Sequence, residues 1–423
     1  MASALDFMLA ARRSEMQGLR SLELTCELVG CIGRLIHALQ RERGFSNIYL
    51  GSHEERYRAG LDDLTADSQR MQQQVVECFA RIDLESGCGA DKARLFNHIA
   101  YVLHYFESFA ELRRRIRSQQ ILPMDATRAF SRPIKGLLNV VFEAADTAVD
   151  PQITRHLVAL FNFMQGKELA GQERAAGVAG FTLGYFDPAA QAHLGFLEDA
   201  QKRCFEIFND YAEPGLRRLW RNLCADQIVL ELGKLRQIAL RSSQASPIAP
   251  ALAEIWFELA SQRIDVMKQL EDQMTEHLHS QCQRKILQAQ SDLDNHRALL
   301  KRLASLDEDA SLLATRVFNL QSTDLDASDA LGGQLNRSVM DVLHAQNLRL
   351  QALGVELEEA RRSLNERKLI DRAKALLMKQ HELTEDAAYR MLQNAAMERS
   401  QRLADVAQHL LNYAELLQGK AKL

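Results

Sequence analysis

Apolar residues recur every three to four positions along almost all of this 423-residue chain, and that periodicity restricts the fold more than any other feature. Alternating runs of β-branched residues, the pattern typical of strands, are absent. The seven prolines all precede residue 251, where they separate the periodic segments. We therefore predict an all-α protein. Its helices are expected at residues 17–50, 54–82, 90–117, 133–149, 151–181, 188–211, 214–241 and 250–297 or beyond.

The expected helices divide the chain into three regions. Long helices with short connections favour two four-helix bundles, which we assign to residues 17–300. The stretch 318–337, rich in Ser, Asp and Gly, predicts a linker. A long linker helix from Asn336 to about Gln380 follows, and its heptad-like apolar spacing suits a coiled-coil seam. We assign residues 301–360 to this linker and coiled-coil helix, and residues 361–423 to a small three-helix C-terminal domain.

Charge and cysteine content exclude several classes of protein. The net charge of -4 argues against a globally basic nucleic-acid-binding protein. The seven cysteines contain no C-x-x-C pair and fit reduced thiols better than a disulfide framework or a zinc site. Charged residues in the first thirty positions exclude a signal-peptide core, and no run approaches the ~20 apolar residues that span a bilayer. We expect a cytoplasmic protein without a membrane segment.

An arginine in the first helix occupies a position at which the pattern requires an apolar residue. Counting in threes and fours from Ile36 and Leu39 leads to Arg43 and then to Leu50. A buried charge is costly unless it is paired. Arg43 should therefore face either an internal carboxylate or a bound anion.

The same element occurs a second time. Residues 172–177 (Gln-Glu-Arg-Ala-Ala-Gly) repeat residues 41–46 (Arg-Glu-Arg-Gly-Phe-Ser) at an offset of 131 positions. Gly171 and Gly177 flank Arg174, although each glycine costs roughly 1 kcal/mol in a helix. Small residues beside an inward arginine would leave room for a small guest.

A third arginine, Arg236, lies one turn from both Leu232 and Leu240. Guanidinium groups from two or three helices, in a mostly apolar setting, suit a small planar oxyanion. The alternative is that each arginine pairs with an internal carboxylate. The candidates for that role are Glu42, Glu173 and Glu231.

With these residues, the region from about Leu35 to Gln290 resembles the NIT domain, the nitrate- and nitrite-sensing module of bacterial regulators and receptors. The resemblance is carried by Leu35-Ile36-His37-Ala38-Leu39-Gln40-Arg41-Glu42-Arg43-Gly44-Phe45-Ser46 and by Gln172-Glu173-Arg174-Ala175-Ala176-Gly177. It implies two helical bundles that hold nitrate or nitrite between them through paired arginines. Arg43 and Arg174 match that pattern, and we add Arg236 from its spacing. The expected ligand-binding residues are Arg43, Gly44, Ser46, Arg174, Gly177 and Arg236.

The C-terminal region is locally basic, with ten Lys/Arg against six Asp/Glu between Arg361 and Arg402. Thr384 and Ser400 are good N-caps for its second and third helices. Basic side chains interleaved with Tyr389 suit RNA loops, because phosphates attract cations and unstacked bases need a flat partner. From charge alone, a solvated helical face with Tyr389 in the core is the alternative.

This region is similar to the ANTAR RNA-binding domain over about Leu364 to Leu416. The similarity is carried by Arg367-x-x-Ile370-x-x-Ala373-Lys374-x-Leu376-Leu377-Met378 and by Leu383-x-x-x-Ala387-x-Tyr389-x-x-Leu392-x-x-Ala395-Ala396-Met397. Ala375 and Gln393 depart from the residues the family often carries. The resemblance implies binding of paired hairpins in a leader transcript, which prevents a terminator from forming. The expected RNA-binding residues are Arg367, Lys374, Tyr389, Arg390, Gln393 and Arg402.

Enzyme motifs are missing from the sequence. It contains no Gly-rich phosphate loop, no H-E-x-x-H and no G-x-S-x-G, and Glu276-x-x-His279 is its only Glu-x-x-His. A di-iron bundle would need two such motifs and further glutamates. We expect neither an enzyme, nor a metal site, nor a cofactor.

The two resemblances together are those of a nitrate- and nitrite-responsive transcription antiterminator. Its effector would be nitrate or nitrite, and its partner would be leader-mRNA hairpins. A homodimer and an indirect contact with transcribing RNA polymerase are also expected. We hypothesise that the anion neutralises Arg43 and Arg174, which otherwise repel each other, and so frees the C-terminal domain. The alternative is a ligand-gated helical signalling module that acts through protein–protein contacts.

Overall fold

Helices dominate the architecture of this computed structural model, which describes residues 4–52, 55–82, 90–147, 150–305, 365–399 and 401–420. Within these ranges the only β-type pairing is one isolated bridge between Ser243 and Ser246. The prediction of an all-α fold is confirmed. None of the described helices combines the length and the apolar character needed to cross a membrane.

The first bundle contains four long helices and one short turn. They are α1 (Ala4–Ser52), the 3-10 helix η1 (Glu55–Tyr57), α2 (Arg58–Ala80), α3 (Ala90–Arg117) and α4 (Pro123–Thr147). The prediction that a helix begins at Pro133 is wrong, because α4 begins ten residues earlier and contains Pro133. Phe130 and Ile134 on either side are fully buried. Their packing offsets the hydrogen bond that a proline removes from a helix.

The second bundle follows from residue 151. Its helices are α5 (Pro151–Leu183), α6 (Pro188–Tyr211), α7 (Pro214–Cys224), α8 (Gln227–Arg241) and α9 (Leu252–Ser305). The prediction of one helix over 214–241 is wrong, because the chain breaks between α7 and α8. Asp226 has extended backbone there and accepts a hydrogen bond from the Ile228 N–H. Asp commonly caps the start of a helix in this way.

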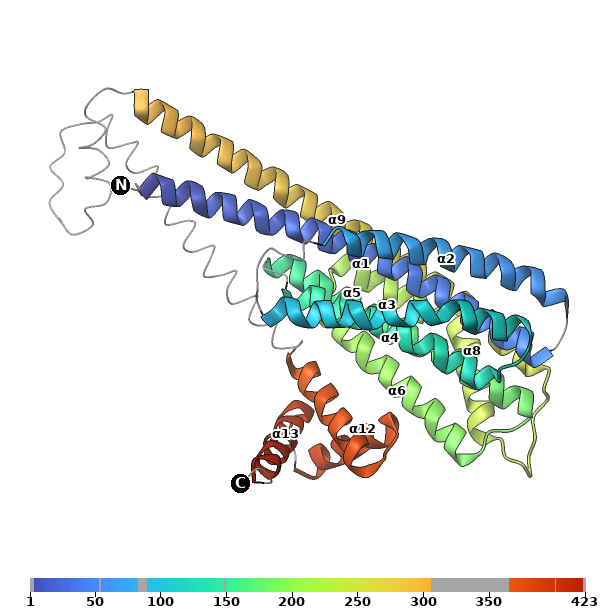
Figure 1. Ribbon diagram of the computed structural model, residues 1–423. Coiled ribbons are helices and arrows are strands. Elements are labelled where there is room, and N and C mark those ends of the chain that lie inside the picture. Colours follow the sequence, from blue (N-terminus) through green and yellow to red (C-terminus); the bar gives the residue numbers. More distant parts are fainter. Residues whose placement is uncertain are drawn as a thin grey trace.

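Contacts between α1 and α9 and between α4 and α5 join the two bundles. The two long helices α1 and α9 continue side by side beyond the rest of the bundles (Figure 1). One large apolar core runs through both bundles, and a smaller one surrounds Phe181, Phe186 and Trp256. The candidate arginines therefore lie where two packed bodies meet.

The C-terminal domain has its own small core. It consists of a helix over residues 365–381, α12 (Glu385–Arg399) and α13 (Leu403–Lys420). Thr384 caps α12 by accepting a hydrogen bond from the Ala387 N–H, as the sequence predicts. The linker at 318–337, Ser400 and the coiled-coil part of the linker helix lie outside the described residues. A coiled coil there stays a prediction, as do the domain boundaries.

Candidate oxyanion site between two helices

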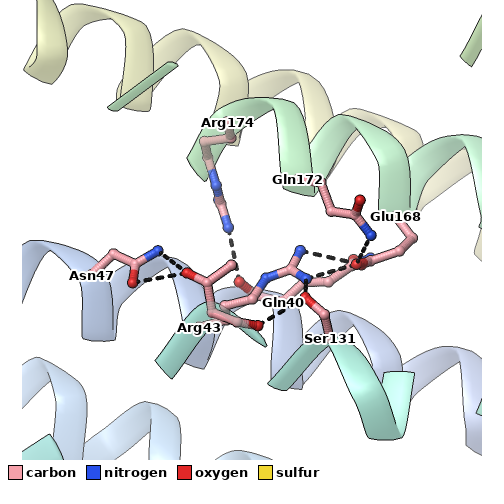
Figure 2. A network of polar contacts seen from close by, with 8 residues as sticks. Gln40, Arg43, Asn47, Ser131, Glu168, Gln172 and Arg174 are labelled. Atoms are coloured by element: carbon pink, nitrogen blue, oxygen red, sulfur yellow. Dashed lines mark hydrogen bonds and ion pairs between the residues drawn. The ribbon is translucent and has the colours of Figure 1, made fainter. Parts of the chain in front are cut away.

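Arg43 and Arg174 are both buried, and each crosses from its own helix to the other (Figure 2). Arg43, on α1, pairs with Glu168 on α5 through two bonds, Nη1 to Oε1 at 2.6 Å and Nη2 to Oε2 at 3.2 Å. Its Nη1 also donates to Ser131 Oγ on α4 at 2.9 Å. The buried charge of Arg43 thus has a carboxylate partner.

Two amide side chains complete the hydrogen bonding of that carboxylate. Gln40 Nε2 donates to Glu168 Oε2 at 2.8 Å, and Gln172 Nε2 donates to Oε1 at 3.0 Å. Gln40 lies one turn before Arg43, and Gln172 lies one turn after Glu168. Helical spacing therefore places all of these donors on the facing sides of α1 and α5.

Arg174 crosses in the opposite direction but binds neutral groups. Its Nη2 donates to the Gln40 carbonyl oxygen and its Nη1 to Ser261 Oγ, both at 2.8 Å. Its guanidinium lies 5.0 Å from the centre of the Phe257 ring. Burial, followed by the positive charge of Arg43, lowers the pKa of Arg174 to about 10. Arg174 is thus a buried cation whose hydrogen bonds go to uncharged oxygens.

Two glycines make room for the crossing arginines. A Cβ on Gly44 of α1 would collide with the guanidinium of Arg174, and a Cβ on Gly171 of α5 would lie 2.6 Å from Arg43 Nη2. Each guanidinium thus rests against the bare backbone of the opposite helix. This explains why glycines occur within two long helices despite their cost in helix stability.

The other two small residues predicted for the site have different neighbours. Gly177 accommodates the indole of Trp256, whose Nε1 donates to the Arg174 carbonyl oxygen at 3.0 Å. Ser46 Oγ donates to the Glu42 carbonyl oxygen at 2.7 Å. Gly177 therefore supports the backbone that carries Arg174, and Ser46 bonds within its own helix.

Arg236 has an internal carboxylate partner. Its Nη2 donates to Glu173 Oε2 at 2.9 Å, and Gln201 donates to the same oxygen. Arg263 Nη1 lies 3.5 Å from that oxygen. Burial raises the pKa of Glu173, but the charges of Arg236 and Arg263 outweigh it and lower the pKa overall. For Arg236, the structure therefore agrees with the alternative interpretation, in which the arginine pairs with an internal carboxylate.

Glu42 also belongs to a buried pair within one bundle. Arg113 of α3 donates to both of its carboxylate oxygens, at 2.8 and 3.0 Å. The sequence offered Glu42, Glu173 and Glu231 as candidate partners of the inward arginines, but the partner of Arg43 is Glu168, which was not among them. Little in the sequence indicates Glu168. It stands six positions before Arg174, and its neighbour Gln40 stands three before Arg43, and these polar residues become noticeable only once the two helices are known to face each other.

The predicted RNA-binding residues lie largely against the sensor helices. Arg367 Nη1 donates to Asn162 Oδ1 on α5 at 3.3 Å, and its guanidinium lies 5.0 Å from the Phe161 ring centre. Arg390 Nη2 donates to the Ala192 carbonyl oxygen on α6 at 2.8 Å. These contacts occupy two of the cationic groups that the sequence predicts as RNA contacts.

Tyr389 is held in the same interface. Its ring lies edge-on to Phe196 at a centroid distance of 6.1 Å, and the Arg203 guanidinium lies 4.5 Å from its centre. Both partners belong to α6. In this arrangement the ring packs against protein groups, so it is not presented to a base.

The remaining three predicted residues are Lys374, Gln393 and Arg402. Lys374 Nζ lies 2.7 Å from Asp371 and 3.1 Å from Glu385. Glu385 also pairs with Lys135 of α4 at 3.2 Å. Gln393 is half-buried, and Arg402 is exposed with Glu366 at 3.7 Å.

No metal ligands were predicted, and one group among the described residues could hold a cation. His156, Glu213 and His277 place their ligand atoms within 4.8 Å of one another. Glu213 lies 3.0 Å from a ring nitrogen of each histidine. The carboxylate therefore already serves as the hydrogen-bond partner of both rings.

Both regions of the chain match known families. Residues 34–279 match the family model described as nitrate and nitrite sensing (NIT), and residues 358–411 match the ANTAR domain. The chain is 33% identical over 413 residues to the nitrate regulatory protein of Klebsiella oxytoca, covering 97% of this chain and 95% of that protein.

A solved structure is similar over nearly the same length. The structure of the NasR transcription antiterminator is 31% identical, with a TM-score of 0.59, and the match covers 97% of this chain and 99% of that one. Both family resemblances drawn from the sequence are confirmed. The regulatory nature of these relatives also confirms that the chain is not an enzyme.

Proposed function

Because the chain belongs to the family of nitrate- and nitrite-sensing regulators that carry an ANTAR domain, we propose that it is a nitrate- or nitrite-responsive transcription antiterminator. The anion binds between Arg43 and Arg174. The C-terminal domain, once freed, binds hairpins in a leader mRNA and prevents terminator formation. The observation that carries this proposal is the pair of buried arginines that cross between α1 and α5 over opposed glycines.

Charge balance supports an anion at this place. Arg43 and Arg174 contribute two positive charges, and Glu168 contributes one negative charge, which leaves an excess of one positive charge in a buried cluster. A monovalent oxyanion removes that excess. Hydrogen bonds between a guanidinium and an oxyanion are strong and directional. The hypothesis that the anion neutralises both arginines is therefore revised, because Glu168 already neutralises Arg43.

Helix α5 links the anion site to the docked C-terminal domain. Arg174 and Glu168 lie on α5, and the same helix carries Asn162 and Phe161, which hold Arg367. A change in how α5 sits against α1 reaches the docking surface within a few turns of one helix. Nitrate shifts the balance only if it binds the released arrangement more tightly than the docked one.

An RNA-binding assay on the full chain tests the proposal. We expect nitrate to increase binding of a leader hairpin strongly, and Arg174→Ala to abolish the increase. Arg390→Ala should weaken binding at saturating nitrate and reduce its salt dependence, because one phosphate contact is lost. If nitrate binds but no RNA is bound at any nitrate concentration, the alternative of a signalling module acting through protein–protein contacts is favoured.

The same proposal includes the cellular setting. Leader transcripts are made in the cytoplasm, so we place the protein there, acting close to transcribing RNA polymerase and contacting it indirectly. We also propose a homodimer, because two copies would present two C-terminal domains to a pair of hairpins. Sedimentation of the full chain with and without nitrate tests the dimer.

A further inference from the structure

The buried carboxylate of Glu168 is fully hydrogen-bonded by side chains of the protein. Its side chain is 3% exposed, and its carboxylate accepts four hydrogen bonds, two at each oxygen. Arg43 supplies two of these donors, Gln40 one and Gln172 one. The cradle is thus complete for a planar group with two oxygens.

Nitrate and carboxylate offer such a set of donors nearly the same pair of oxygens. Both are planar anions with delocalised charge, and a guanidinium binds two oxygens of either one side by side. A set of donors that fits the Glu168 carboxylate therefore also fits two oxygens of nitrate or nitrite. The two Nη atoms of Arg43 cannot bind both anions side by side at the same time.

The internal repeat shows that only one arginine has such a partner. Shifting Glu168 by the 131-residue offset leads to His37, which stands six positions before Arg43 as Glu168 stands six before Arg174. Burial, followed by the charges of Lys167 and Lys268, lowers the pKa of His37 to about 2. His37 is thus neutral, and its buried Nδ1 has no hydrogen-bond partner among the described residues.

We propose that Glu168 is a built-in anion that competes with nitrate for Arg43 and so sets the nitrate concentration at which the sensor responds. This inference rests on the proposed function and names the regulation of the same site. Arg174 donates to a hydroxyl and a carbonyl oxygen, and the only carboxylate paired with His37 among the described residues is the largely exposed Asp265, 3.8 Å from its Nε2. These two side chains form the half of the site that is open to the external anion.

Competition also explains how binding could be converted into movement. In this structure Arg43 and Glu168 form an ion pair between α1 and α5. When nitrate takes the Arg43 guanidinium, that pair is lost, and α5 keeps its link to α1 through Arg174 and the anion. The link between α5 and α1 is then a different one, and α5 is the helix whose Asn162 binds Arg367 of the C-terminal domain.

The test is nitrate titration of the full-length Glu168→Gln variant by calorimetry. Glutamine keeps the size of the side chain but removes its charge, so nitrate no longer displaces an anion. We expect nitrate to bind at least about tenfold more tightly than to the wild type, which corresponds to ~1.4 kcal/mol. Hairpin binding should also begin at correspondingly lower nitrate.

Glu42→Gln is the matched control. It removes another buried carboxylate that binds an arginine bidentately, in the same repeat but within one bundle. It should lower the unfolding temperature and leave the nitrate affinity unchanged. If Glu168→Gln unfolds, Glu168→Asp replaces it, because its shorter carboxylate is drawn away from Arg43 and should also raise the affinity.

The outcomes separate this inference from the proposed function. Tighter nitrate binding to the Glu168 variant alone supports the competition. Binding to wild type that depends on Arg43 and Arg174 but is unchanged or weakened by Glu168→Gln overturns the competition and leaves the proposed function intact. If neither protein binds nitrate or nitrite, the proposed function fails together with the inference.

Discussion

The two Glu-Arg elements, one on α1 and one on α5, have the same design and different electrostatics. In both, the glutamate binds an arginine of its own bundle, Glu42 with Arg113 and Glu173 with Arg236. In both, the arginine crosses to the opposite helix. Arg43 meets a carboxylate there, whereas Arg174 meets a carbonyl and a hydroxyl. Equal burial thus leaves one cation neutralised and the other in need of an anion.

The largest expected effect comes from removing the neutralised cation. Arg43→Ala leaves Glu168 buried without its ion-pair partner, which should lower the free energy of unfolding by about 3–5 kcal/mol. Urea unfolding of the full chain measures this. The double variant Arg43→Met/Glu168→Met should recover much of the loss, because no charge is then stranded. Equal instability of the single and double variants would contradict the pairing.

Removing the other cation should affect binding more than stability. Arg174→Met keeps an unbranched side chain of similar length but removes a charge that has no carboxylate partner. We expect the free energy of unfolding to change by less than ~1 kcal/mol, and nitrate affinity to fall by about a hundredfold, or ~2.7 kcal/mol. Calorimetry and urea unfolding on the same preparation give both numbers. A stability loss as large as that of Arg43→Ala would show that both arginines stabilise the fold equally, and so would contradict the difference between the two elements.

The opposed glycines allow the two elements to be disturbed separately. Gly44→Ala pushes on Arg174, and Gly171→Ala pushes on Arg43. Both should reduce nitrate affinity, and Gly171→Ala should also cost about 1–3 kcal/mol of stability, because the Arg43–Glu168 pair has little freedom to move. Gly233→Ala is the control, since a Cβ there meets nothing within 4 Å. That variant should be more stable by about 0.5–1 kcal/mol.

The smallest effect concerns the surface that holds the C-terminal domain. Lys135→Glu places a negative charge opposite Glu385 without altering any residue expected to bind RNA. Because this pair is partly exposed, each such contact is worth at most about 1 kcal/mol. We expect hairpin binding in the absence of nitrate to rise only a few-fold, and the increase to shrink at high salt. No increase would show that this ion pair does not hold the domain.

Much of the fold and half of the site follow from helical periodicity. The pattern predicts α3 to the residue, and the two inward arginines are visible as charges in an apolar register. Periodicity states which face of a helix a residue occupies, but not which helix lies opposite. For that reason Arg236 appeared equivalent to Arg174, although Glu173 of its own bundle binds it. Glu168 became recognisable only when α1 and α5 were seen to face each other.

The docking of the C-terminal domain was beyond the reach of the sequence for a similar reason. Arg367 and Tyr389 read as candidate RNA ligands because of their chemistry, and the same chemistry suits Phe161, Phe196 and Arg203 on the sensor. Cationic and aromatic groups that fit a nucleic acid also fit an aromatic protein surface. Only the arrangement in space shows which of these partners is engaged.

The reciprocal fit of each glycine to the opposite arginine has a consequence for sequence evolution. Positions 44 and 174 share one space, as do positions 171 and 43. A side chain can grow at one member of a pair only if the other becomes smaller. Among homologous chains, each pair should therefore covary, and a chain with alanine or serine at position 44 should have lost the long cation at 174.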